Sequence, residues 1–358
     1  NKTLLDNLKR IGSFTNLPEV TTKLSSQIYN YRNKAIIPIR RTKETGIISG
    51  YYRPGSHEIV NIDNCPVIYV DLNSVFTAIK RIVNNTALKA DPDIIEKGYL
   101  RHIVLKQGHF TGEIQVGFIS GQPLNDEFKS IAIDLSKSFP KIVSIVNNIQ
   151  PLKNNKIFGT TTNVLHGRKY IFELFCNLKF IIGIQTFFQV NILEAERVVD
   201  LIRMDVKAME NTNRVIDAYS GIGTISLPVS TLGIQVIGIE QNDESYNYSL
   251  INKENNSLNS IEFIHGDVQN HLNDLLKTSD YLIVDPPRKG LNEKVLQTIL
   301  TKKPQHISYL SCNTATLSRD LKILCNHNLY HIRSIYTFDF FPQTTHLESL
   351  VFLSLTTS

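Results

Sequence analysis

The sequence has few cysteines and no long apolar run, and both shortages narrow the class of protein. Four cysteines occur in 358 residues, and their spacing shows no pairing pattern. This favours a reducing, cytoplasmic setting over a secreted, disulfide-bonded protein. No run of roughly 18 apolar residues exists, so we expect no membrane-spanning helix, and no secretory signal peptide is visible. Internal repeats and low-complexity tracts are also lacking. We therefore expect a monomeric, globular, cytoplasmic protein with no membrane partner.

Length and charge are compatible with two domains and with a polyanionic partner. A chain of 358 residues is long enough to give each of two domains a sizeable core. The net charge is +5 and the isoelectric point is about 8.8. This basic balance permits nucleic-acid binding but does not establish it.

The pattern of predicted elements changes near residue 183. Before that point, short strands mix with a few helices, which predicts an α+β domain over residues 1–183. After it, helices alternate with buried strands at 214–218, 236–240, 261–265, 281–285, 307–310, 331–338 and 349–353. This alternation predicts an α/β domain over residues 184–358, with a doubly wound sheet of about seven strands. The last two strands have a short connection, so we expect them to be antiparallel.

Cys312 lies at the turn between a predicted strand and a predicted helix. Residues 306–310 are β-favouring and apolar, and residues 316–321 follow as a capped helix. Ligands of open α/β sheets bind at this edge, and the partial positive charge of a helix N-terminus favours a thiolate. A small buried hydrophobe is the ordinary alternative for a cysteine. We adopt that alternative for Cys176 and Cys325, but interpret Cys312 as reactive because of its neighbours.

The turn from Asp217 to Thr224 follows a strand and opens a helix. Its glycines allow backbone amides to approach a ligand closely. Glu240 ends the next strand, where an acid can accept hydrogen bonds from ribose hydroxyls, and Asp267 follows the third strand near where an adenine edge would lie. The turn has neither the G-x-G-x-x-G spacing nor a Walker lysine. This favours S-adenosylmethionine over NAD, with a purely structural loop as the alternative.

The loop Asp285-Pro-Pro-Arg288 and the segment before the last strand suggest the chemistry. Amine-directed methyltransferases usually need an aromatic residue where Arg288 stands, so Arg288 argues against amine methylation. The C5 carbon of uracil is a poor nucleophile, but addition of the Cys312 thiolate to C6 would let C5 attack a methyl sulfonium. A base must then remove the C5 proton. Glu348 is the candidate, with His346 as a rival, because an antiparallel last strand would return Glu348 to the edge where Cys312 lies.

Six ordered motifs closely resemble the RNA 5-methyluridine (uracil-C5) methyltransferases. They are FFQVN at 187–191, DAYSGIGT at 217–224, IGIE at 237–240, DPPRKG at 285–290, SCN at 311–313 and FPQTTHLE at 341–348. Weaker matches are YRNK at 31–34, GYYRPGSH at 50–57, LRH at 100–102 and TGE at 111–113. The 23S ribosomal RNA branch of the family is the closer likeness. The resemblance implies that the C-terminal sheet is a Rossmann-like class I methyltransferase sheet.

The resemblance also implies roles for single residues. Cys312 would be the nucleophile and Glu348 the base. Contacts to S-adenosylmethionine would come from Gln189, Tyr219, Thr224, Glu240, Asp267 and Asp285. Phe187 would help to hold the target base, which must leave its stack to reach the thiol. The implied partner is RNA, with 23S ribosomal RNA favoured and transfer RNA as the alternative.

The early strands carry basic and aromatic residues, a composition typical of a nucleic-acid surface. A solvated hairpin face is the alternative. The residues concerned are Arg32, Lys34, Arg40, Arg41, Lys43, Arg53, Tyr29, Tyr31, Tyr51 and Tyr52.

Two departures from the family bear on these expectations. Many relatives begin with a β-barrel RNA-binding domain, and many carry a 4Fe-4S cluster on four cysteines, three of them upstream of the part that matches residues 1–12. Neither upstream part is in this sequence. Cys65 matches the fourth cysteine but has no C-x-x-C partner, so it would be a cluster ligand only in a longer form of the chain, and a plain buried cysteine is the alternative. The residues present predict no metal site.

Two other functions stay open. One is a different S-adenosylmethionine enzyme that methylates cytosine C5 or a small aromatic compound. The other is a non-catalytic module that binds RNA or assists its folding.

Overall fold

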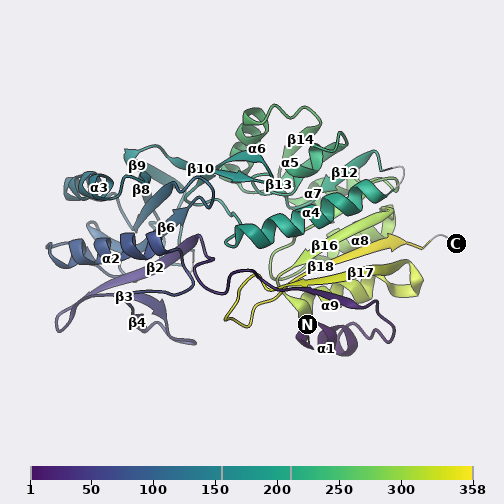
Figure 1. The fold of residues 1–358 in the computed structure, drawn as a ribbon, viewed down its shortest axis with the longest axis horizontal. Helices are drawn as coiled ribbons and strands as arrows, with labels where there is room; N and C mark the ends of the chain where they lie inside the picture. Colours follow the sequence, from purple (N-terminus) through teal and green to yellow (C-terminus); the bar gives the residue numbers. More distant parts are fainter. Residues whose placement is uncertain (1, 155, 210–211, 357–358) are drawn as a thin grey trace. The chain divides into compact units, whose positions relative to one another are not determined.

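A computed structural model describes residues 2–154, 156–209 and 212–356 (Figure 1). The chain forms two compact units. The C-terminal unit contains the chain up to Ser26, Phe175–Lys179 and Phe187–Ser358, and the middle unit contains Gln27–Leu174 and Phe180–Thr186. The sequence pattern predicted that all of 1–183 would form one domain. The structure instead groups the first segment with the C-terminal unit, because β1 (Val20–Lys23) pairs with β17 (Tyr330–Phe338) and α1 (Lys2–Arg10) buries its leucines in that core.

The C-terminal unit is built on an eight-stranded sheet in the order β1-β17-β18-β16-β15-β12-β13-β14. The seven predicted strands are all present, as β12 (Arg214–Asp217), β13 (Gln235–Glu240), β14 (Ile261–His265), β15 (Tyr281–Val284), β16 (His306–Ser311), β17 and β18 (Glu348–Leu355). β18 lies antiparallel to both β16 and β17, and the other pairs are parallel. The sequence predicted only an extended segment where β1 adds the eighth strand.

Helices cover both faces of this sheet, as the alternating pattern predicts. They are α4 (Ile192–Ala208), α5 (Ser226–Ser230), α6 (Asp243–Asn255), α7 (Val268–Leu275), α8 (Glu293–Lys302) and α9 (Thr314–Leu324), with a short 3₁₀ turn, η1 (Asn326–Asn328). Apolar residues of α1, α7, α8 and α9 join one core with the sheet, and α4, α5 and α6 lie on the other face (Figure 1). Strands buried on both faces read as continuous apolar runs, such as Tyr281–Val284. None of the helices in the described ranges is long and apolar enough to cross a membrane.

The middle unit has the α+β architecture that the sequence predicts. Its main sheet follows the order β4-β3-β2-β6-β7-β8-β9, with β5 beside β6, and β10 and β11 form a separate hairpin. α2 (Val70–Asn84) and α3 (Asp126–Ser138) pack on one face and bury their apolar sides in a core with the strands. The strands are β2 (Lys34–Thr42), β3 (Gly46–Tyr52), β4 (Ile59–Asn61), β5 (Lys89–Ala90), β6 (Tyr99–Gln107), β7 (Ile114–Ser120), β8 (Ile142–Ile149), β9 (Thr161–Gly167), β10 (Tyr170–Phe175) and β11 (Leu178–Gly183).

Candidate active site

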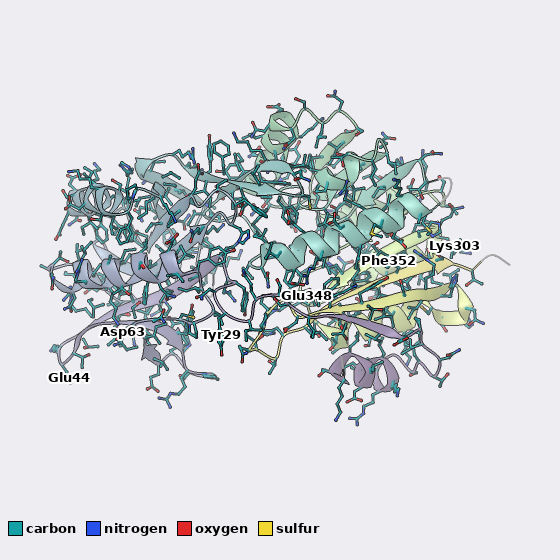
Figure 2. All side chains as sticks on the ribbon, in the orientation of Figure 1. Tyr29, Glu44, Asp63, Lys303, Glu348 and Phe352 are labelled. Carbon is teal, nitrogen blue, oxygen red and sulfur yellow. The ribbon has the colours of Figure 1, made fainter. Side chains whose placement is uncertain are left out.

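Strand register brings Cys312 and Glu348 to the same edge of the C-terminal sheet. Ser311, the last residue of β16, pairs with Ser349 of the antiparallel β18. Cys312 is the residue after Ser311 and Glu348 is the residue before Ser349, so two neighbouring strands present the thiol and the carboxyl side by side. Figure 2 shows Glu348 at the start of β18, with Phe352 further along the same strand. Both Cys312 and Glu348 are partly exposed.

Asp285 reaches the same edge on the next strand. It follows β15, which pairs in parallel with β16. The loop after it closes through Gly290, whose N–H donates to the Pro287 carbonyl at 2.8 Å. Gly290 has φ +76°, and a Cβ there would lie 2.6 Å from Oδ2 of Asp320, so this turn requires glycine.

A side-chain cap ties the two loops of the site together. Asn313 accepts hydrogen bonds from the first amides of α9, at 3.0 Å from Ala315. Its Nδ2 donates to the carbonyl of Arg288 at 3.0 Å. The loop that carries Cys312 and the loop that carries Arg288 are therefore fixed to each other.

The acidic groups of the site keep their protons to a higher pH than usual. Burial raises the pKa of Cys312, the charges of Glu348 and Asp285 raise it further, and the positive charge of Arg288 lowers it. Burial and the charge of Asp285 raise the pKa of Glu348 to about 8. Burial and the charge of Asp217 raise the pKa of Asp285 to about 7. The sequence predicted a helix N-terminus that favours the thiolate, but burial and the carboxyl groups outweigh that effect here.

Arg288 is the contact that sequence reasoning missed. In the sequence, Arg288 served only as an argument against amine methylation, whereas its side chain hydrogen-bonds to Cys312. The available signal was its position on a loop whose acid, Asp285, was already expected at the same edge. His346, the rival base, is exposed, and its ring packs on Phe341 with 5.9 Å between centroids. The charged groups that act on the thiol are Glu348, Asp285 and Arg288, which favours Glu348 over His346.

The turn between β12 and α5 and the end of β13 form a second part of this edge. Gly221 has φ +57° and a Cβ there would meet nothing within 4 Å, so the turn faces open space. The Gly221 N–H donates a hydrogen bond to Oε2 of Glu240 at 2.8 Å, and the Asn242 N–H donates to Oε1 of Glu240 at 2.5 Å. A third bond comes from the backbone of Gln241. Because a carboxylate offers about four lone-pair sites, Glu240 keeps capacity for a hydroxyl donor, which fits the ribose of S-adenosylmethionine.

The other predicted cofactor residues lie at or near this edge, and one of them, Asp267, also caps a helix. Tyr219 and Thr224 are partly exposed in the β12–α5 turn. Asp267 caps α7 and accepts a hydrogen bond from the Gln269 N–H at 3.1 Å, so part of its hydrogen-bonding capacity serves the helix. Gln189 lies in the segment before α4, which Asn191 fixes by donating to the Phe340 carbonyl at 3.1 Å.

Comparison with known proteins decides the family. The model of the family described as tRNA (Uracil-5-)-methyltransferase matches residues 14–356. An uncharacterized RNA methyltransferase of Prochlorococcus marinus is 44% identical over 357 residues, which are 100% of this chain and 85% of the relative. The chain therefore belongs to the tRNA (uracil-5-)-methyltransferase family. An uncharacterized RNA methyltransferase of Bacillus cereus (strain ATCC 10987 / NRS 248) is 35% identical, over 99% of this chain and 77% of the relative.

A solved member of the tRNA (uracil-5-)-methyltransferase family has the same fold. The tRNA (uracil-54, C5)-methyltransferase of Pyrococcus abyssi, in complex with S-adenosyl-L-homocysteine, is 27% identical, with a TM-score of 0.77 over 98% of this chain and 82% of that chain. The predicted family and the predicted class I methyltransferase fold are thus confirmed, and the chain is an RNA methyltransferase. None of these three relatives names 23S ribosomal RNA.

Several basic residues of the predicted RNA surface are engaged in internal contacts, whereas Tyr29, Tyr51 and Tyr52 are exposed. Arg40 forms ion pairs with Asp91 and Asp93, at 3.1 and 2.6 Å. Arg41 donates to three backbone carbonyls near the end of α2. Other residues of this set also have partners within the protein. Arg53 forms an ion pair with Glu58 at 3.0 Å. Lys34 lies over the Phe158 ring and burial lowers its pKa to about 8, while Tyr31 is only 2% exposed. Composition therefore overstated the charge that this hairpin face offers to RNA.

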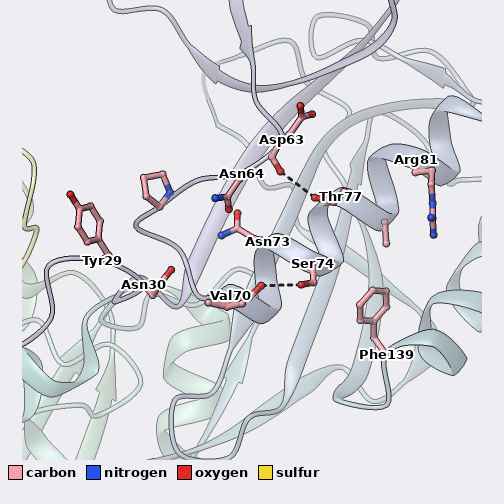
Figure 3. Close-up of a pocket in the computed structure, with 12 residues that line it drawn as sticks. Tyr29, Asn30, Asp63, Asn64, Val70, Asn73, Ser74, Thr77, Arg81 and Phe139 are labelled. Carbon is pink, nitrogen blue, oxygen red and sulfur yellow. Dashed lines mark hydrogen bonds between the residues drawn. The ribbon is translucent and has the colours of Figure 1, made fainter.

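A groove on the middle unit is lined by residues of α2 from Val70 to Arg81, by Tyr29 and by Phe139 (Figure 3). Cys65 lies in the chain between Asn64 and Pro66, which also line this groove. The groove has a volume of about 860 Å³. Asn73 holds the Cys65 backbone with two bonds of 2.9 Å, and Cys65 is 8% exposed. Within the described ranges, no group of three or more His, Cys, Asp or Glu side chains could hold a metal ion. A role of Cys65 as a cluster ligand in a longer chain stays a prediction.

The two remaining cysteines were predicted to lie in the core. Cys176 and Cys325 are only partly buried. Burial nevertheless raises the pKa of each thiol to about 12. Both are therefore protonated at neutral pH, unlike a reactive thiolate.

Proposed function

We propose that this chain transfers a methyl group from S-adenosylmethionine to C5 of a specific uridine in RNA. The favoured substrate is 23S ribosomal RNA, and transfer RNA is the alternative because the similar Pyrococcus abyssi enzyme acts on it. The observation that carries the proposal is the register that sets Cys312 beside Glu348 at one sheet edge. The middle unit contributes to RNA binding.

S-adenosylmethionine supplies an electrophilic methyl group when it is bound. Glu240 would accept hydrogen bonds from its ribose, and the open side of the turn at Gly221 would leave room for it. Gln189, Tyr219, Thr224, Asp267 and Asp285 would complete the binding site. Asp285, whose charge acts on the Cys312 thiol, would also face the uracil.

Cys312 and Glu348 carry the chemistry on the uracil. The Cys312 sulfur forms a bond to C6, and the electron pair of the C5–C6 double bond becomes available at C5 for the new carbon–carbon bond to the methyl group. The bond from that methyl group to the sulfonium sulfur would break, and S-adenosylhomocysteine would be the leaving group. Glu348 then removes the C5 proton. The pair left behind restores the C5–C6 double bond, and the bond between sulfur and C6 breaks. The cysteine leaves as a thiolate, so the enzyme returns to its starting state once Glu348 releases its proton.

The charges of the site suit this sequence of steps. The Arg288 side chain hydrogen-bonds to Cys312 and so stabilises the thiolate before attack and after release. Burial and Asp285 hold the pKa of Glu348 at about 8, which makes its carboxylate a stronger base than an ordinary glutamate.

The test compares Cys312→Ala with Glu348→Gln. Cys312→Ala should abolish methyl transfer and any covalent RNA adduct. Glu348→Gln should instead accumulate the adduct as a band that survives denaturing electrophoresis, because elimination stalls. Full methylation by Cys312→Ala would sink the proposal, and equal loss of the adduct in both variants would remove Glu348 from the role of base.

Substrate experiments separate the alternatives. Tritium release from RNA with 5-tritiated uridine, but not with 5-tritiated cytidine, is expected. Release from cytidine would identify a cytosine enzyme, and tight RNA and cofactor binding without turnover would identify a non-catalytic module. Mapping 5-methyluridine in ribosomal and transfer RNA of cells that lack the gene decides between the two RNA classes.

A further inference from the structure

Exposed phenylalanine side chains single out two positions in the chain. All 17 phenylalanines lie in the described ranges, and only Phe110 and Phe187 are exposed, at 50% and 60%. Phe187 belongs to a motif with an expected role at the target base. Phe110 lies in the loop between β6 and β7 of the middle unit and has no assigned role. An aromatic ring left in water forgoes the free energy of burial, so an exposed Phe on a defined surface indicates a binding position.

The loop that carries Phe110 is held by a buried carboxylate. Glu173 of β10 is 0% exposed. It accepts backbone hydrogen bonds from His109, Phe110, Thr111 and Leu174, with 3.1 Å between the Phe110 nitrogen and Oε1. Burial raises the pKa of Glu173, and these four bonds oppose the rise. A buried acid used in this way fixes the loop backbone in one conformation.

A second set of bonds braces the loop from its other end. Thr111 Oγ1 donates to the Phe172 carbonyl at 2.7 Å, and the Phe172 N–H donates to Oε2 of Glu113 at 2.7 Å. The loop closes on itself through Gly108 and Gly112, with 3.0 Å between the Gly112 nitrogen and the Gly108 oxygen. Gly108 leaves no room for a side chain, since a Cβ would lie 2.1 Å from Thr111 Oγ1. The mobility that usually accompanies a surface loop is therefore suppressed at its tip.

An aromatic group contacts the exposed ring, and basic residues precede the strand that braces the loop. The His109 ring meets Phe110 edge-on at 4.6 Å between centroids, and Nδ1 of His109 pairs with the Tyr69 hydroxyl at 2.8 Å. The Arg168 guanidinium lies 4.6 Å from the centroid of the Phe172 ring on the strand that braces the loop. Lys169, which is exposed, follows directly in the chain. Arg168 also forms an ion pair with Glu113. A fixed, exposed aromatic ring matches the face of a nucleobase.

We propose that loop 108–112 is a stacking platform on which Phe110 holds an unpaired base of the RNA substrate. The inference rests on RNA being the substrate, as the proposed function has it, and adds a second base contact to the one expected at Phe187. The platform is rigid before RNA arrives, so little conformational entropy is lost on binding. Stacking is tolerant of base identity, so Phe110 contributes affinity and register more than sequence reading.

The absence of tryptophan from the chain makes a direct test available. Phe110→Trp introduces a single tryptophan at the platform, and the emission of that tryptophan should be strongly quenched on titration with substrate RNA. Phe110→Ala should raise the Kd for RNA by about 5- to 100-fold, the range for loss of one stacked base, with S-adenosylmethionine affinity unchanged. Glu173→Gln should give an intermediate rise, because the ring stays but its loop loosens.

Ile133 supplies the matched control. It is 44% exposed on α3, so Ile133→Trp and Ile133→Ala change an exposed apolar side chain away from the platform. Neither should respond to RNA or alter its Kd by more than about twofold.

The outcomes separate this inference from the proposed function. Unchanged RNA affinity in Phe110→Ala, with unquenched emission of Phe110→Trp at saturating RNA, would overturn the platform even if methylation proceeds normally. Quenching by RNA in a protein that fails to methylate would support the platform and count against the proposed reaction. If the emission of Phe110→Trp changed on addition of ribosomal protein freed of RNA, but not on addition of RNA, the loop would instead be a binding site for a protein partner.

Discussion

Two glutamates, one in each unit, show how the neighbouring groups decide what an acid does. Glu173 in the middle unit accepts four backbone N–H bonds, so its carboxylate is satisfied and holds a loop in place. Glu348 in the C-terminal unit lies near the charge of Asp285 and has the nearby Arg288 as its counter-charge. Its proton is therefore exchanged near neutral pH. The first arrangement is structural and the second suits proton transfer.

The same distinction separates the arginines. Arg40 and Arg41 are used in ion pairs and in bonds to backbone carbonyls, whereas the Arg288 side chain contacts the Cys312 sulfur. Residue type alone suggests RNA binding for all three. The partners assign two of them to stability and one to chemistry. Substitutions that remove these contacts should therefore lower stability in the middle unit and lower the rate of methyl transfer in the C-terminal unit.

Apart from the loss of Cys312 or Glu348, loss of Arg288 should give the largest effect on the rate of methyl transfer. Arg288→Leu removes the group that lowers the pKa of both Cys312 and Glu348, so methyl transfer at pH 7.5 should fall by about 10²- to 10³-fold, as for loss of one charge-stabilising donor. Arg288→Lys keeps the charge and should recover part of the loss. Single-turnover rates with saturating cofactor measure both, and wild-type rates in Arg288→Leu would show that the thiol needs no cation.

The pH dependence of methyl transfer should follow Glu348. Its pKa of about 8 means that the carboxylate needed as a base is scarce at lower pH. The single-turnover rate should therefore rise by about tenfold per pH unit from pH 6 to pH 8, and more steeply if formation of the Cys312 thiolate, whose pKa is also raised, limits the rate as well. RNA and cofactor binding measured at each pH serve as controls. A rate that is flat between pH 6 and 8 contradicts Glu348 as the rate-controlling base.

Sequence reasoning succeeded where periodicity and register carry the information. The seven alternating strands of the C-terminal sheet and the antiparallel return of β18 follow from buried runs and a short connection. With them comes the approach of Glu348 to Cys312. Sequence reasoning failed where the pairing partner of a strand comes from a distant segment of the chain. β1 joins the sheet through pairing with β17, more than 300 residues away, and no local pattern announces that pairing.

The sequence could not predict which basic side chains of the middle unit are paired with acids, for the same reason. The acids that neutralise Arg40 lie about 50 residues later in the chain, and the sequence does not say that they meet. The platform at Phe110 was also missed, since Glu173 is far from the loop in sequence and four of its contacts are to backbone amides. The match of Thr111-Gly112-Glu113 to the family was the one sequence feature that drew attention to this loop.

Replacement of Glu173 should weaken the middle unit. Glu173→Gln places an NH₂ group where an oxygen now accepts backbone N–H bonds, so donors face a donor. The expected cost is about 1–3 kcal/mol of unfolding free energy, seen as a lower thermal midpoint. Glu173→Asp, which keeps the charge but shortens the reach, should lose less. Unaltered stability in Glu173→Gln would show that the four bonds contribute little.

The corresponding change in the C-terminal unit should have the opposite sign and a smaller size. The pKa of Glu348 rises from an ordinary 4.5 to about 8 on folding, so its contribution to stability is full below pH 4.5 and is lost as the pH rises through 8. Glu348→Gln carries no such charge. It should match the parent at pH 5 and be more stable by about 1 kcal/mol at pH 8.5, a value below the full linkage because the side chain is partly exposed. Chemical unfolding at the two pH values, with Cys312→Ala as the control that keeps Glu348, measures the difference. A variant that is less stable than the parent at pH 8.5 would mean that Glu348, like Glu173, is held by bonds that favour its charge.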